Sequence, residues 1–181
     1  MKLAEMKAKV YQLIEEYSED SDDLTEDEDL ASKMNTVINQ VLTEMSRFKK
    51  IDAYKELDVQ EGEIIDFQDI DKQLYQINII RGLDFDIIGN KVIFNEKGTA
   101  KIFYYKYPTQ IDEDTDDDEY EFEVSTDVLE IMPYGIASDL LKSDVSSNYG
   151  QIYAQRFQEM KQQLDSRNAM TSIYIDGGVS I

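Results

Sequence analysis

The chain has 181 residues, of which 41% are hydrophobic, and its 39 acidic and 18 basic side chains give a net charge of −21. It contains no cysteine, histidine or tryptophan, which excludes disulfides, thiolate or histidine catalysis and most zinc sites. Binding to phosphates requires clustered lysine and arginine, so such an acidic chain is expected to repel nucleic acid and anionic membranes. No apolar run approaches the roughly 18 residues of a membrane span, and the charged N-terminus does not resemble a signal peptide. We therefore expect a soluble protein made in a reducing cytoplasm.

Helical periodicity opens the chain. Apolar residues spaced by three and four predict a helix over residues 2–17. A loop with eight acids follows over residues 18–29, and Thr25 with Glu28 forms a capping box for a second helix that runs to about Lys50.

From Ile51 the period changes to two. Short runs rich in β-branched and aromatic residues, separated by glycine-containing turns, predict an antiparallel meander from about Leu57 to Val124. The stretch DFDIIGNKVIFN predicts a hairpin with a two-residue Gly89-Asn90 turn of type II′. The last predicted strands are AKIFYYKYP and EYEFEV.

The helical period returns after Val124. Asp127 is expected to cap a short turn, and Pro133 to lie in the first turn of the next helix. A long helix then follows from Ser146 or Ser147 to about Asn168. The predicted fold class is α+β, with an antiparallel helical bundle (residues 1–50 and 125–170), an inserted antiparallel β-meander module (51–124) and an extended C-terminal tail (171–181).

The most acidic tip of the chain is a candidate site. Acids stand at positions 1, 3, 5, 7 and 12 counted from Asp112, as in a calcium-binding loop, but Asp117 replaces the required glycine and the flanks predict strands. We therefore expect a solvated hairpin loop that acts electrostatically, without metal, cofactor or catalysis. The acidic-loop residues are Asp112, Asp114, Asp116, Asp117 and Asp118.

Two further segments are interface candidates. Tyr104, Tyr105 and Tyr107 lie on both faces of a predicted strand, where aromatic residues serve as core, as cross-strand pairs or as interface anchors. The tail is too short to fold alone, so it is either a frayed end or a strand donated to a partner, and we favour donation. The tail residues proposed for this contact are Ile173, Tyr174, Ile175, Val179 and Ile181.

The block from Ile102 to Leu164 contains the strand YYKYP, a run of acids, the segment LEIMPYGIASDLLKSD and then IYAQRFQEMKQQL. This block resembles the C-terminal half of head–tail connector (adaptor) proteins of tailed bacteriophages. The segment LTEDEDLASKMNTVINQVLTEM resembles the early helices of that family. The resemblance implies a structural, non-enzymatic virion protein, assembled in the host cytoplasm at the head–tail junction. It implies a homo-oligomeric ring of about twelve subunits. The ring would bind the portal and a downstream neck or tail protein, and DNA would pass through it without specific binding.

Other classes of protein stay open. An acidic inhibitor that mimics DNA needs carboxylates spaced evenly along one face, whereas 17 of the 39 acids lie in two loops, at residues 18–29 and 112–123. A tail-completion component is a second alternative. A glycosidase-like pair of carboxylates is expected by chance among so many acids, and none lies in an apolar run that would raise its pKa.

Overall fold

The computed structural model describes residues 1–15, 28–143 and 148–170 of the chain. The chain divides into two compact units. The first unit comprises Met1–Ile38 and Ser125–Ile181, and the second comprises Asn39–Val124. The first boundary falls inside a helix, whereas the sequence predicts it near residue 50; the predicted domain limits stay predictions.

The first unit is helical. It contains α1 (Leu3–Glu15), the first part of α2 (Glu28–Phe48), α4 (Thr126–Leu140), the 3₁₀ turn η2 (Leu141–Ser143) and α5 (Tyr149–Met170). α4 packs against both α1 and α5. The Tyr153 hydroxyl donates to the Leu13 carbonyl at 2.7 Å, which fixes α5 to α1. Gly135 brings α4 close to α5, because a Cβ atom there would lie 3.0 Å from the Phe157 ring. None of the described helices is both long enough and apolar enough to span a bilayer.

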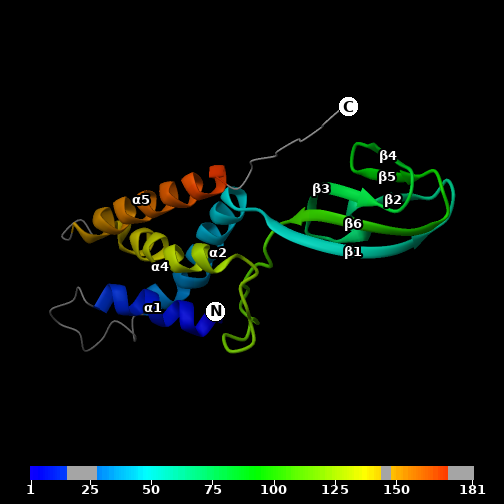
Figure 1. The fold of residues 1–181 in the computed structure, drawn as a ribbon. Coiled ribbons are helices and arrows are strands. Elements are labelled where there is room, and N and C mark those ends of the chain that lie inside the picture. Colours follow the sequence, from blue (N-terminus) through cyan, green and yellow to red (C-terminus); the bar gives the residue numbers. More distant parts are fainter. Residues whose placement is uncertain (16–27, 144–147, 171–181) are drawn as a thin grey trace, which may run out of the picture. The chain divides into compact units, whose positions relative to one another are not determined.

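The second unit contains the rest of α2 and two three-stranded antiparallel sheets, with strand orders β1-β6-β3 and β2-β5-β4 (Figure 1). The bounds are β1 (Ile51–Val59), β2 (Ile64–Asp66), β3 (Leu74–Arg81), β4 (Phe85–Ile88), β5 (Lys91–Phe94) and β6 (Gly98–Lys106), with a short α3 (Phe67–Ile70). Both sheets bury their inner faces in one hydrophobic core. Its fully enclosed members include Val92 and Phe94 from one sheet and Ala100 and Ile102 from the other.

The predicted fold class, an antiparallel helical bundle with an inserted β-meander and an extended tail, is wrong. The described residues form a mixed α and β protein with five α-helices and two sheets, and the sheets form its main hydrophobic core. The first strand pairs with the last along nine residues, from Ile51–Lys106 to Val59–Gly98, so the strands do not follow one another as in a meander. Two sheets then bury each other's inner faces, which a single meander cannot do. The predicted tail, residues 171–181, lies outside the described residues.

Two local predictions are also wrong. Residues 119–124 form no strand, and only Glu121 makes an isolated bridge. Pro133 lies in the middle of α4, and the N-cap position is held by Ser125 rather than Asp127, with no side-chain capping hydrogen bond from Ser125. An interior proline costs a helix about 3 kcal/mol. The burial of most of α4, including Val128 and Met132, outweighs this cost, since each fully buried large apolar side chain contributes about 1.5–3 kcal/mol.

Candidate interaction site: an anchored acidic loop

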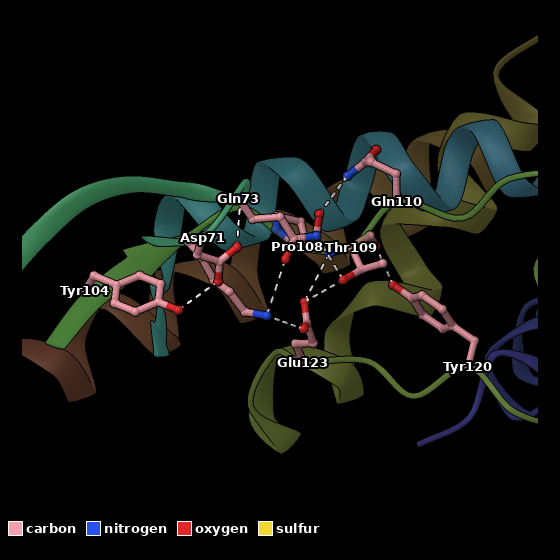
Figure 2. Close-up of polar contacts among 9 residues, drawn as sticks. Asp71, Gln73, Tyr104, Pro108, Thr109, Gln110, Tyr120 and Glu123 are labelled. Atoms are coloured by element: carbon pink, nitrogen blue, oxygen red, sulfur yellow. Dashed lines mark hydrogen bonds and ion pairs between the residues drawn. The ribbon is translucent and has the colours of Figure 1, made fainter. Parts of the chain in front are cut away.

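The segment that leaves β6 is tied back to the sheet by one carboxylate, Glu123 (Figure 2). Glu123 forms an ion pair with Lys106 and accepts a hydrogen bond from the Thr109 backbone N–H at 3.0 Å. Gln73 joins the same group: its Nε2 donates to Thr109 Oγ1 at 3.0 Å and its Oε1 accepts from Lys106 at 3.4 Å. The Lys106 and Glu123 side chains are only 17% and 28% exposed, so water and salt screen the pair weakly. The two ends of the segment 107–124 are therefore held together.

This group continues into the core of the sheets through Asp71. Its carboxylate accepts from the Gln73 N–H at 2.9 Å and from the Tyr104 hydroxyl at 2.8 Å. Burial and the bond to Asp71 raise the pKa of Tyr104 to about 12. Burial by itself would raise the pKa of Asp71, but the Gln73 N–H, the Tyr104 hydroxyl and the cations of Lys106 and Lys55 together lower it. Asp71 therefore stays ionised near neutral pH and orients Gln73 toward the loop.

A second anchor comes from α2. The Asn39 side chain donates from Nδ2 to the Ile111 carbonyl at 2.7 Å and accepts from the Ile111 N–H at 2.9 Å. The Ile111 side chain is itself buried, with 4% exposed. An asparagine amide offers one acceptor and two donors, so it satisfies both backbone groups of Ile111 as a neighbouring strand would. The loop thus starts from a fixed backbone position.

Tyr120 closes the loop at its other end. Its hydroxyl donates to the Thr109 carbonyl at 2.6 Å, and its ring meets Phe122 edge-on with centroids 5.2 Å apart. Burial, followed by the charge of Glu123, raises the pKa of Tyr120 to about 12. Phe122 and Val124 are both buried, which explains the alternating pattern that predicts a strand there. The side chains alternate as in a strand, but the backbone forms no sheet ladder.

The acidic tip is shaped by its own side chains. Thr115 Oγ1 donates to Asp112 Oδ1 at 2.6 Å and accepts from the Asp112 N–H at 2.9 Å. Asp116 Oδ1 accepts from the backbone N–H groups of Asp118 and Glu119, at 2.8 and 3.3 Å. Such Asx and Ser/Thr turns fix a loop without a metal.

Most of the predicted acidic-loop residues face solvent. Asp112, Asp114, Asp116 and Asp118 are exposed, and Asp117 is half-buried. Within the described residues, which include this whole loop, no group of three or more acidic side chains is arranged to hold a metal ion. The loop therefore presents a negative surface whose position is set by the anchors at Asn39 and Glu123.

The predicted interface tyrosines separate into two environments. Tyr104 points into the core, whereas Tyr105 and Tyr107 lie beside Tyr75, with ring centroids 6.4 and 4.7 Å from it. Lys50 Nζ lies 4.3 Å from the centre of the Tyr105 ring. Tyr107 is 47% exposed and available to a partner. The interface roles of these residues stay predictions, and the tail candidates Ile173, Tyr174, Ile175, Val179 and Ile181 lie outside the described residues.

Sequence reasoning missed the residues that hold the loop: Asn39, Gln73 and Glu123. Asn39 gives a signal that could have been used, since it is a polar residue between the buried Ile38 and Val41 on α2. Gln73 gives none, because it is one polar residue among many, and Glu123 stands out only as position 12 of the calcium-loop pattern, which does not predict an anchor. No protein-family model matches the chain, and no curated protein matches it significantly.

Proposed function

We propose that this chain is a structural protein of the head–tail junction of a tailed bacteriophage, a connector that forms a ring on the portal. The proposal starts from the resemblance of residues 102–164 to connector proteins. The observation that carries it further is the acidic loop, Asp112–Glu119, which is exposed at its tip and anchored at both ends. A loop built only to be soluble needs no such anchors.

An anchored acidic loop suits a surface past which DNA moves. A net charge of −21 repels phosphate, and repulsion lets a duplex slide where lysine and arginine would retain it. The same carboxylates can dock on a basic partner surface, and their fixed position makes that contact specific at little entropic cost. In this proposal about twelve copies form the ring, as closed cyclic assemblies of identical heterologous contacts do.

The direct test is assembly with a portal. The purified protein is imaged by negative stain alone and after mixing with the portal protein encoded in the same genome. Rings on the portal, with or without free rings, are the expected result. A chain that stays monomeric, ignores the portal and instead binds a nuclease tightly would overturn the proposal in favour of a DNA-mimic inhibitor.

A matched pair of variants tests the acidic loop itself. Neutralising three of its exposed aspartates should leave the unfolding temperature unchanged but alter portal binding, its salt dependence or DNA passage. Neutralising three exposed acids elsewhere in the same unit changes the net charge equally and should have a smaller effect. The loop variant carries Asp114→Asn, Asp116→Asn and Asp118→Asn; the control carries Glu61→Gln, Asp69→Asn and Glu96→Gln. Equal effects of the two variants would show that only net charge matters.

A further inference from the structure

The outer face of the sheet β1-β6-β3, here called the aromatic face, exposes large apolar side chains. Ile102 and Tyr104 are buried, so strand alternation places Phe103 and Tyr105 on the opposite side of β6. Tyr54 and Ile79 flank Phe103 from the neighbouring strands, and they are 48% and 40% exposed. The Tyr54 and Phe103 rings lie 4.9 Å apart. This is a continuous apolar surface across three strands.

The outer face of the other sheet, β2-β5-β4, here called the isoleucine face, is also apolar. Val92 is fully buried, so the next residue along β5, Ile93, lies on the outer side together with its register partner Ile64. Ile88 lies on the same side of β4, because it pairs with Lys91, two residues from Ile93. Ile64 is 59% exposed and Ile88 is 66% exposed. Among the described residues, six of the eight exposed large hydrophobic side chains belong to the unit Asn39–Val124.

The two faces point away from each other, because the inner faces of both sheets share one core. Their charges also differ. On the aromatic face, Arg81 and Lys50 lie over the rings of Phe103 and Tyr105, 5.7 and 4.3 Å from the centroids.

The isoleucine face is instead mainly acidic. Asp86 lies beside Ile93 in register, Asp66 beside Lys91, and Asp84 is joined to Asp86 through Asn95. The aromatic face also carries acids, Asp52, Glu56 and Asp58, along β1. Its charge therefore complements the isoleucine face only around Arg81 and Lys50, whose cations can meet Asp66, Asp84 and Asp86.

We propose that the aromatic face of one copy packs on the isoleucine face of the next copy, head to tail. Two different faces on opposite sides of one unit make a heterologous contact, which repeats until the rotation closes a ring. The face pairing rests on the exposed residues and charges above, and only the closure into a ring rests on the proposed function. It adds to that function by naming the surfaces that join the subunits.

Other occupants fit these faces less well. Single-stranded nucleic acid stacks on aromatic residues beside a cationic groove, but Asp52, Glu56 and Asp58 line the β1 side of the aromatic face. Two aromatic faces packed on each other would form a closed dimer and leave the isoleucine face exposed. Only the head-to-tail contact covers both faces with one type of interface.

The chain has no cysteine, which makes cross-linking a clean test. Ile79→Cys marks the aromatic face and Ile88→Cys marks the isoleucine face, each in the full-length protein. The two variants, one carrying a tag that changes its mass, are treated with a short thiol cross-linker alone and after mixing, in free and portal-bound assemblies. A mixed dimer that forms only after mixing, and a ladder of oligomers from the double variant, are expected. Homodimers of Ile79→Cys alone, or assemblies without the mixed product, would overturn the face pairing.

A second pair of variants removes the contact. Ile88→Asp should weaken self-association at least tenfold by analytical ultracentrifugation. Ile152→Asp is the control, because Ile152 is 52% exposed but lies on α5 in the other unit. Equal self-association of the two variants would contradict the inference. Portal-bound rings without the mixed cross-link would reject the face pairing and retain the proposed function. Head-to-tail ladders without portal binding would retain the face pairing and reject the proposed function.

Discussion

The two hydrogen bonds from the Asn39 side chain to the backbone of Ile111, here called the Asn39 clamp, offer the sharpest test of how the acidic loop is held. Asn39→Ala removes two hydrogen bonds to the backbone of Ile111, of 2.7 and 2.9 Å. Each bond contributes about 1 kcal/mol net, and leaving the partly buried N–H and C=O without partners adds up to about 1 kcal/mol more. We therefore expect the free energy of unfolding to fall by about 2–3 kcal/mol. For a chain of this size the unfolding temperature should fall by roughly 4–12 °C.

Urea unfolding followed by circular dichroism measures this loss, and hydrogen exchange of the amides from Ile111 to Tyr120 reports whether the loop is released locally. The matched control is Gln40→Ala, an exposed neighbour on the same helix, which should change stability by less than about 0.5 kcal/mol. If Asn39→Ala changed the free energy of unfolding no more than this control and the loop amides exchanged as in the wild type, the Asn39 clamp would not stabilise the loop, and other contacts would position it.

Three further substitutions test the network and the sheet turns. Tyr104→Phe should cost about 1–2 kcal/mol in urea unfolding near neutral pH. Because the pKa of Tyr104 is raised from 10.0 to about 12, its stabilising contribution is complete below pH 10 and is lost as the pH rises toward 12, so the variant and wild type should converge there. Asp71→Asn should cost about 1–3 kcal/mol at neutral pH. The lowered pKa of Asp71 means that the difference from wild type should shrink as the pH falls below 3.8, measured by acid titration of stability. Gly82→Ala should lower the unfolding temperature more than Gly62→Ala, because both have positive φ (103° and 77°) but only at Gly82 would a Cβ meet a backbone atom, the Thr99 carbonyl oxygen at 2.9 Å.

The sequence predicts the elements whose local signals agree with their environment. The hairpin of β4 and β5 forms around Gly89-Asn90, with φ of 61° at the glycine and a non-positive φ at Asn90, as a type II′ turn requires. The long α2 and α5 also form close to their predicted limits. In each case turn chemistry or helical periodicity was sufficient to predict the element, because its formation does not depend on contacts with residues far away in the sequence.

The sequence fails where tertiary contacts override local pattern. β1 was missed because Lys55 interrupts the inward row of Ala53 and Leu57; its ammonium leaves the core by donating to the Ile70 carbonyl. The pairing of β1 with β6 joins residues more than 38 positions apart, and no spacing rule predicts it. The sequence does not predict the contacts that anchor the acidic loop for the same reason, since Asn39 and Ile111 are separated by 72 residues.

The net charge of the chain opposes self-association, whereas the proposed face contact favours it, and the two effects respond differently to salt. Copies that each carry a net charge of −21 repel one another at low ionic strength, while the proposed face contact depends on apolar burial and a few marginal charges. At about 0.15 M salt the Debye length is only about 8 Å, so the long-range repulsion is screened while contacts inside the interface persist. Raising salt from low to physiological concentration should therefore strengthen self-association, measured by sedimentation. Self-association that weakens steadily with salt would mean that ion pairs, rather than the aromatic and isoleucine faces, hold the copies together.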